Sequence, residues 1–180
     1  MPEHLPSYTI ADYEHWEGDW ELIKGIPWSV RSSQIRTRPT RKWSRVLVEL
    51  LRYIGNQVAG LAEANCEVVA QLDWAIDEHT VLRPDIAIIY CGSADFITQL
   101  PLVIIEISTP YTAVLDRKIK FAIYEEQQVP YYMLVNPETE KFITYVLING
   151  KYVEHLGNLF QLPEGCTITI DVAKVLEELA

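Results

Sequence analysis

The stretch 83–124 contains Arg83-Pro84-Asp85, Pro101-Leu-Val-Ile-Ile-Glu106-Ile-Ser108, and Asp116-Arg-Lys-Ile-Lys120 followed by Tyr124. It predicts two apolar strands and then a helix, with one acid at the start of the first strand and one near the end of the second. In an antiparallel pair of neighbouring strands, the start of one lies beside the end of the other. Asp85 and Glu106 are therefore expected at the same edge of the sheet.

Two carboxylates in such apolar surroundings repel each other and lose hydration, so a cation between them is a natural remedy. Oxygen ligands favour a hard ion, Mg²⁺ or Mn²⁺. Helical spacing places Asp116, Lys120 and Tyr124 on one line, and Lys120 or Lys118 could supply a nearby ammonium. The alternative is structural: both acids bind loop amides, and Lys120 pairs with Asp116 as an ordinary helix ion pair.

Further elements follow from hydrophobic periodicity and turn residues. Thr9 is a candidate helix cap, and the late turn Asn149-Gly150 joins two strands. The central elements are a hairpin over 20–31, a helix over 41–59, strands over 67–76, 81–90, 102–107 and 129–135, and a helix over 113–128. The C-terminal part adds a hairpin over 142–155 and a short acidic helix over 172–179.

The chain has 180 residues, 49% of them hydrophobic, which fits one domain with a sizeable core and a small extension. No apolar run is long enough to cross a bilayer, and the start of the chain lacks the plan of a secretion signal, so a cytoplasmic location is expected. The cysteines Cys66, Cys91 and Cys166 lack CxxC spacing, which indicates neither a disulfide framework nor a zinc cluster. Each is expected to be a buried or half-buried small residue.

The formal net charge is −10, which argues against a protein that coats nucleic acid through a general positive field. The charge is segregated, however, because residues 31–52 hold seven basic residues and a single acid. This segment is either a solvated face or a strip that contacts phosphates. The candidate nucleic-acid-binding residues in it are Arg36, Arg38, Arg41, Lys42 and Arg45. Trp43 among them could stack on a base, although packing against the core is the commoner outcome.

The ordered motifs resemble the Uma-two family of putative restriction endonucleases, a branch of the PD-(D/E)-x-K nuclease superfamily. The motifs are Pro84-Asp85, Ile-Ile-Glu106-Ile-Ser108-Thr109, the Asp116–Lys120–Tyr124 series, and Val129-Pro-Tyr-Tyr-Met-Leu-Val-Asn-Pro137. Upstream, Tyr8-Thr-Ile-Ala-Asp-Tyr and Trp20-Glu21-Leu-Ile-Lys-Gly25 extend the match to about residues 8–156. The resemblance implies an α/β (α+β) fold: a restriction-endonuclease-like core with a central mixed sheet flanked by helices, and additional N- and C-terminal hairpins. It also implies a single nuclease-like domain over 1–180, with a core over about 8–156 and a C-terminal extension over 157–180.

The resemblance also implies a metal site that binds Mg²⁺ or Mn²⁺ through Asp85, Glu106 and the backbone carbonyl of Ile107. The sequence alone favours Glu21 as an exposed residue at a strand edge, whereas the resemblance implies that it is a further ligand. Lys120 would serve as the catalytic lysine, because the superfamily's usual lysine position holds Ser108. Ser108, Asp116, Lys118 and Tyr124 are candidate supporting residues.

The chain departs from the family pattern at the start of the long helix, where Lys42-Trp43-Ser44 replaces a histidine-containing sequence. Two functions compete. One is a metal-dependent DNA endonuclease, a hydrolase of phosphodiester bonds. The other is a non-catalytic protein that keeps the nuclease fold and binds nucleic acid or protein. The aromatic-rich strands and the late hairpin leave room for a homodimer interface.

Overall fold

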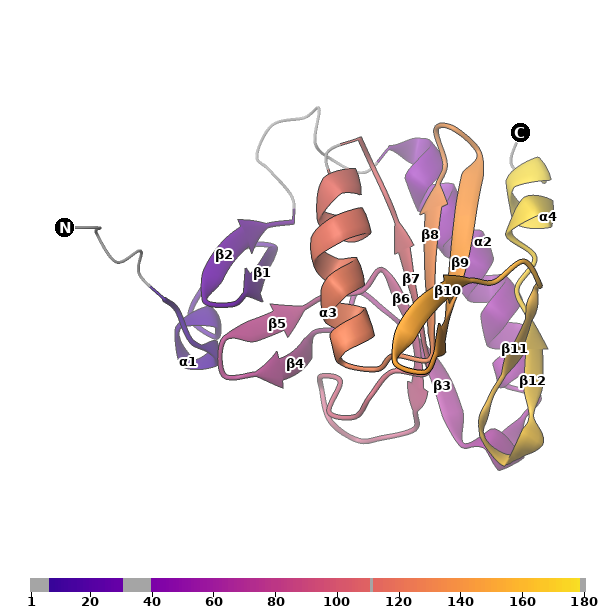
Figure 1. Cartoon of the computed structure of the whole chain (residues 1–180), viewed down its shortest axis with the longest axis horizontal. Coiled ribbons are helices and arrows are strands. Elements are labelled where there is room, and N and C mark those ends of the chain that lie inside the picture. Colours follow the sequence, from indigo (N-terminus) through magenta and orange to yellow (C-terminus); the bar gives the residue numbers. More distant parts are fainter. Residues whose placement is uncertain (1–6, 31–39, 111, 179–180) are drawn as a thin grey trace.

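A six-stranded mixed sheet forms the centre of the computed structural model, which describes residues 7–30, 40–110 and 112–178 (Figure 1). Its strand order is β10-β9-β8-β7-β6-β3. Only the β7–β8 pair is parallel among these described strands. The strands are β3 (Cys66–Ala70), β6 (Ile86–Tyr90), β7 (Val103–Ile107), β8 (Tyr131–Asn136), β9 (Lys141–Ile148) and β10 (Lys151–Glu154). The predicted mixed central sheet is confirmed.

A smaller four-stranded sheet, with the order β2-β1-β5-β4, lies to one side of the central sheet, next to the N-terminal residues (Figure 1). Its strands are β1 (Trp20–Ile23), β2 (Ile26–Ser29), β4 (Trp74–Asp77) and β5 (Thr80–Leu82). The β1–β2 hairpin was predicted. It is tied to the rest of the chain by the pairing of Leu22 with Val81. Before this hairpin, α1 (Ile10–Tyr13) begins with a capping box between Thr9 and Asp12.

Two predicted strands are each divided between the two sheets. The strand expected over 67–76 is two strands, β3 and β4, separated by residues 71–73. The strand expected over 81–90 is β5 and β6, separated by Arg83-Pro84-Asp85. Because Pro84 has no N–H to give to a neighbouring strand, the pairing partner changes there. This break leaves Asp85 directly before the first residue of β6.

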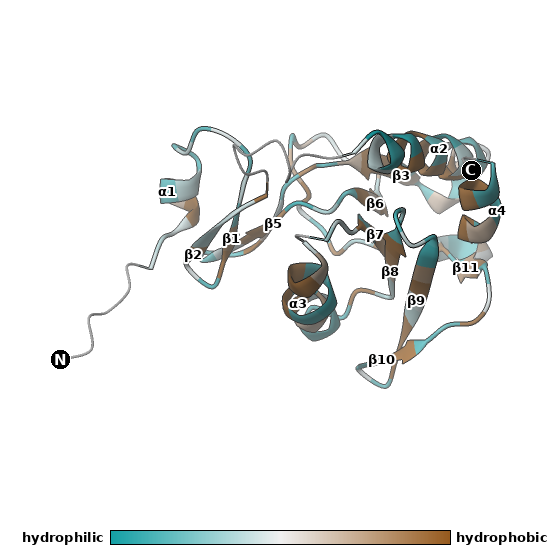
Figure 2. Ribbon diagram, turned by 90° about the horizontal axis from the view of Figure 1, so that it is seen from above, coloured by the Kyte–Doolittle hydropathy of each residue, from teal (hydrophilic) through white to brown (hydrophobic). Residues whose placement is uncertain are grey.

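Helices cover both faces of the central sheet, as Figure 2 shows from above. On one face lies α2 (Arg41–Val58), whose buried residues Val46, Leu50, Ile54 and Val58 follow the predicted helical spacing. On the other face lies a helical rod made of a π-helical segment, η3 (Leu115–Lys120), and α3 (Phe121–Glu126). Residues 113–114 are also helical, so the rod begins where the helix predicted over 113–128 begins and ends two residues earlier, at Glu126.

The two faces of β7 bury residues against different layers. Val103, Ile105 and Ile107 belong to the core under α2, and Ile104 belongs to the core under α3. All five residues of β7 are buried. The predicted alternation of faces is therefore confirmed.

The C-terminal part of the chain packs on the α2 side. It comprises β11 (Leu159–Gln161), β12 (Thr167–Thr169) and α4 (Val172–Glu177). Phe160, Ile168 and Val175 enter the same core as α2. Two short 3-10 turns, η2 (Ala62–Ala64) and η4 (Pro163–Gly165), complete the elements.

Two smaller findings bear on the sequence expectations. Cys66 and Cys166 are half-buried and Cys91 is exposed, so the expected burial of Cys91 is wrong. All three thiols are free. Among the described residues, no helix has both the length and the apolar character needed to cross a membrane.

Candidate active site

The antiparallel pairing of β6 with β7 brings Asp85 to Glu106. Ile86 lies opposite Ile105, so the next pair outward is Asp85 and Glu106. Asp85 Oδ2 accepts a hydrogen bond of 2.8 Å from the backbone N–H of Ile107, which fixes the carboxylate at the end of β7. The predicted meeting of the two acids at one sheet edge is therefore present.

The helical rod delivers two side chains to the same carboxylate. Lys120 Nζ lies 2.9 Å from Glu106 Oε1, and the Tyr124 hydroxyl donates a hydrogen bond of 2.7 Å to the same oxygen. Lys120 and Tyr124 lie on one line of the helical rod, as predicted from their four-residue spacing, and both contact Glu106. π-Helical turns are frequent at functional sites, and Lys120 ends the π-helical segment.

The small sheet contributes Glu21 from β1. Its Oε1 lies 2.7 Å from Lys120 Nζ and accepts a hydrogen bond of 2.8 Å from the backbone N–H of Arg83. Its Oε2 is buried and has no hydrogen-bond partner among the described residues. Glu21 is 1% exposed, so the sequence-only expectation of an exposed strand-edge residue is wrong.

One cavity of about 240 Å³ connects these groups. Its polar lining includes Glu21, Asp85, Glu106, Asp116 and Lys120. The walls come from both sheets, from α2 and from the helical rod: Trp28, Ser29, Val30, Trp43, Gln71, Arg83, Ile107, Thr109, Thr112, Val114, Leu115 and Ile119. The cavity is thus built by segments far apart in the sequence.

The cluster holds more negative charge than its lysine can neutralise. Burial, followed by the charge of Glu106, raises the pKa of Asp85 well above its usual range. The same causes raise the pKa of Asp116 to about 7. Burial also raises the pKa of Glu21, although Lys120 opposes the change. The cavity therefore favours an added positive charge or bound protons.

Lys120 stays charged in this environment. Burial alone would lower its pKa, but the nearby carboxylates of Glu106, Glu21 and Asp116 outweigh burial and hold the pKa well above the usual value. Burial and the charge of Glu106 also raise the pKa of Tyr124, so the phenol keeps its proton and donates it to the hydrogen bond.

The ligand atoms are of the type that a hard divalent cation prefers, because they are carboxylate oxygens and one of them is buried without a partner. Their arrangement, however, is not that of a preformed metal site. In the described part of the chain, no three His, Cys, Asp or Glu side chains are grouped so that they could hold an ion. Lys120 Nζ instead bridges Glu21 and Glu106. Lys120 and Tyr124 both bind Oε1 of Glu106.

The structural alternative is present only in part. Asp85 does bind a backbone amide, that of Ile107. Lys120, however, forms its ion pairs with Glu21 and Glu106, across three elements. The ion pairs of Lys120 are therefore not the pair with Asp116 within one helix that the structural alternative expects.

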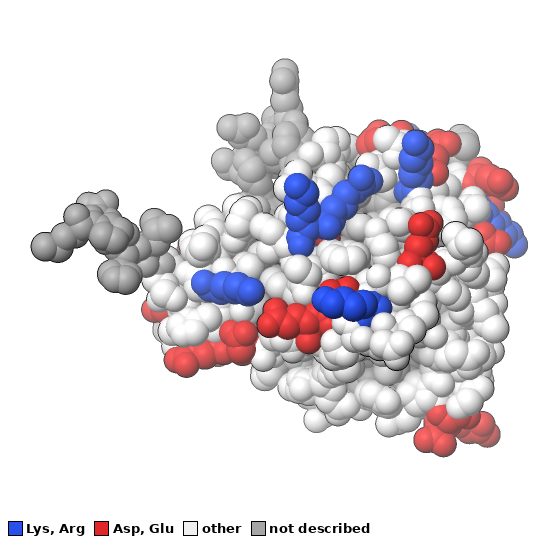
Figure 3. Space-filling view, in the orientation of Figure 1, with Lys and Arg blue, Asp and Glu red and all other residues white. Residues whose placement is uncertain are grey.

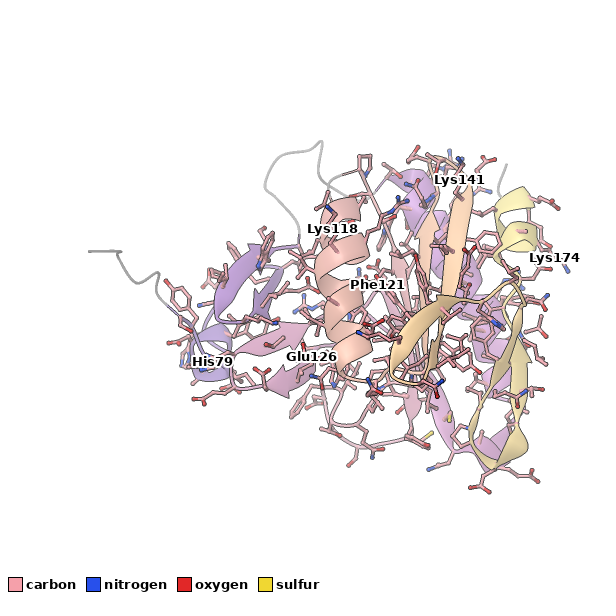
Figure 4. All side chains as sticks on the ribbon, in the orientation of Figure 1. His79, Lys118, Phe121, Glu126, Lys141 and Lys174 are labelled. Atoms are coloured by element: carbon pink, nitrogen blue, oxygen red, sulfur yellow. The ribbon has the colours of Figure 1, made fainter. Side chains whose placement is uncertain are left out.

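Other candidate residues lie differently. Lys118, labelled in Figure 4, is exposed and does not line the cavity. Ser108 is buried, and its hydroxyl donates to the carbonyl of Val135. The carbonyl of Ile107 accepts a hydrogen bond of 2.7 Å from the indole Nε1 of Trp43. This tryptophan is 8% exposed, so it packs in the core as expected.

The candidate basic strip is described only in part. Arg36 and Arg38 lie outside the described residues. Arg41 and Arg45 are exposed on the first turns of α2, and Lys42 forms an ion pair of 2.7 Å with Glu140. Figure 3 shows Lys and Arg side chains interspersed with Asp and Glu over one face of the molecule. The described surface in that view has no continuous basic field.

Sequence reasoning missed the role of Arg83 in holding the two sheets together. Its guanidinium pairs with Asp73 at 2.6 Å and Asp19 at 3.0 Å, and it donates to the Tyr13 hydroxyl. Its backbone N–H binds Glu21. Its position directly before Pro84 was the one available signal, since the chain changes sheets there.

The chain is similar to known proteins in sequence and in fold. The model of the Uma2 family, described as "Putative restriction endonuclease", matches residues 10–172. No curated protein matches the chain significantly. Among solved structures, a putative nuclease belonging to DUF820 from Anabaena variabilis is similar, with a TM-score of 0.71 and 15% sequence identity. The alignment covers 96% of this chain and 99% of that one, and at this identity it supports the fold alone.

Proposed function

Because the chain belongs to the Uma2 family of putative restriction endonucleases, we propose that it is a metal-dependent DNA endonuclease. The observation that carries the proposal is the convergence of Asp85, Glu106, Glu21 and Lys120 on one cavity. Asp85 comes from the break between β5 and β6, and the other three come from β7, β1 and η3. Glu106, Glu21 and Lys120 are buried and Asp85 is half-buried, and bringing them together costs free energy that a merely structural role would not require. The 180 residues are proposed to form one nuclease-like domain, because the C-terminal segment shares the core of α2.

The proposed ligands of Mg²⁺ or Mn²⁺ are Asp85 and Glu106, with Glu21 as a third through its unpartnered Oε2. The Ile107 carbonyl already accepts the Trp43 indole N–H, so it has one lone pair left for a further ligand. When bound, such an ion supplies positive charge that activates water and neutralises charge developing on a phosphate.

The side chains of this chain have their own roles in the proposal. Lys120 orients the attacking water and stabilises negative charge that develops on the phosphate. For this it must loosen its contact with Glu21 or Glu106. Tyr124 holds Glu106 through its hydroxyl, and Arg83 holds Glu21 through its backbone N–H. Asp116, buried and with a pKa raised to about 7 chiefly by burial, is placed to hold a proton near the site.

The test measures plasmid DNA cleavage with Mg²⁺ or Mn²⁺, together with metal binding by titration calorimetry. Asp85→Ala and Lys120→Ala are expected to abolish cleavage, and Lys118→Ala, an exposed lysine on the same rod, is expected to leave it intact. No cleavage with either metal and no heat of metal binding in the wild-type protein would refute the proposal.

A non-catalytic role is the second candidate, and one observation favours it. Lys120 already bridges Glu21 and Glu106, so the cluster is partly neutralised without a cation. This function requires nucleic-acid or protein binding that survives Asp85→Ala. If Asp85→Ala loses this binding together with cleavage, the non-catalytic function is refuted.

A further inference from the structure

Trp28 stands beside the carboxylates, on the side of the cavity formed by the small sheet. It pairs directly with Glu21 across the β1–β2 hairpin. Directly opposed residues of an antiparallel pair point to the same face, with their Cβ atoms close together. Both side chains line the cavity, yet Glu21 is 1% exposed and Trp28 is 37% exposed.

The indole of Trp28 has no place in the cores of the molecule. It belongs to neither of the two hydrophobic clusters of the described residues. Val114, which also lines the cavity, is 65% exposed. The cavity is therefore lined by two exposed apolar side chains as well as by buried carboxylates. A single exposed tryptophan is ordinary on a protein surface, but one beside a buried acid cluster fits a ligand with both a flat apolar part and an anionic part.

The depth of the site limits which nucleic acid can reach it. Glu106 and Asp116 are 2% and 3% exposed, and the cavity measures only about 240 Å³. A rigid duplex keeps its bases paired and stacked and holds its backbone at the rim of such a cavity. A single strand is flexible enough to insert one phosphate while an unpaired base lies on the indole.

The pairing of the basic residues at the cavity also favours a single strand over a duplex. Arg83 and Lys120 both line it, but Arg83 is paired with Asp73 and Asp19, and Lys120 with Glu21 and Glu106. Duplex recognition relies strongly on basic side chains that neutralise phosphates. Because Arg83 and Lys120 are already paired with carboxylates, base stacking should contribute more to nucleic-acid binding here than their contacts with phosphates.

We propose that Trp28 is a base-stacking residue and that the site accepts unpaired nucleotides of single-stranded DNA in preference to duplex DNA. The identity of the nucleic acid as DNA rests on the proposed function. The stacking geometry rests on the placement of Trp28 opposite Glu21.

The experiment measures fluorescence anisotropy of a labelled 12-nucleotide strand without self-complementarity, and of the same strand in duplex form, with Ca²⁺ in place of Mg²⁺. The wild-type protein is expected to bind the single strand at least about tenfold more tightly. Trp28→Ala is expected to weaken single-strand binding about tenfold, the size of one base–aromatic contact, and duplex binding less than twofold. Trp28→Tyr keeps a stacking ring and should restore most of the affinity.

Phe142→Ala is the matched control, because Phe142 is an exposed aromatic residue, at 45%, on β9 and outside the cavity lining. It should change neither affinity. Equal affinity for both DNA forms, or an equal loss in both with Trp28→Ala, would overturn the proposal. A wild-type protein that binds metal and cuts duplex preferentially refutes only this inference. Absence of metal binding and cleavage refutes the proposed function, and the anisotropy ratio still decides the role of Trp28.

Discussion

Replacing Lys120 by methionine should destabilise the cation-free protein strongly, because it removes the one ammonium between two buried carboxylates. Lys120 Nζ lies 2.7 Å from Glu21 Oε1 and 2.9 Å from Glu106 Oε1. The three side chains are 4%, 1% and 3% exposed, so little bulk solvent screens the two ion pairs. Methionine fills a similar volume, which keeps the packing loss small.

The magnitude follows from the burial of both ion pairs. Removing one partner of a buried pair costs about 3–5 kcal/mol, because the remaining charge is left without compensation. For a chain of this size, 1 kcal/mol shifts the melting temperature by about 2–4 °C. Lys120→Met should therefore lower the melting temperature by roughly 6–20 °C near pH 8 in the presence of a chelator.

The destabilisation should depend on pH. Burial already raises the folded-state pKa of Glu21, and Lys120 opposes this change. Without the ammonium the opposition is lost, so the folded-state pKa of Glu21 should lie further above its unfolded-state value. A carboxyl group with a raised folded-state pKa binds more protons in the folded protein, so stability falls as pH rises through the interval between the two values. The loss caused by Lys120→Met should thus be smaller near pH 5 than near pH 8.

The assay is thermal or urea unfolding of the wild type, Lys120→Met and the control Lys118→Met at both pH values. Lys118 is exposed, so its replacement should change the free energy of unfolding by less than about 0.5 kcal/mol. If Lys120→Met costs less than about 1 kcal/mol, or costs more near pH 5, the reasoning from a buried ion pair is wrong. Added Mg²⁺ should restore more stability to Lys120→Met than to the wild type, since the lysine no longer competes for the carboxylates.

Three further changes test separate parts of the site. Asp85→Asn should remove the heat of metal binding and yet raise the stability of the cation-free protein by about 1 kcal/mol, because a half-buried charge beside Glu106 disappears while an acceptor for the Ile107 N–H remains. Calorimetry and urea unfolding measure the two effects, and lower stability would contradict the electrostatic account. Asp116→Asn should flatten the pH dependence of the free energy of unfolding between about pH 4 and 7. Burial raises the pKa of Asp116 from 3.8 to about 7, so the wild type loses stability as pH rises through that interval. An unchanged slope in chemical unfolding would show that Asp116 does not titrate there. Trp43→Phe leaves the Ile107 carbonyl without its indole donor and should cost about 1–3 kcal/mol, measured by urea unfolding; a cost below about 0.5 kcal/mol would mean that water or another donor replaces the indole.

Local patterns in the sequence determined the elements and their faces. The helical spacing of Val46, Leu50 and Ile54 placed α2 and its buried side, and the two-residue period of β7 separated Ile104 from Val103 and Ile105. These features are predictable because they depend on periodicities of 3.6 and 2 within one element. The approach of Asp85 to Glu106 was also predictable, because one antiparallel pairing decides it.

Only the tertiary structure decided which acids are buried together and what Lys120 contacts. Glu21 reaches the site because β1 pairs with β5, which precedes the break at Pro84, and no local pattern encodes that pairing. The contact between the Trp43 indole and the Ile107 carbonyl joins residues 64 positions apart. The division of two predicted strands between the sheets has the same origin, since strand partners are chosen by long-range packing. The sequence by itself determined the parts and two of the acids, and the packing of the small sheet on the large one decided the charge, the depth and the walls of the cavity.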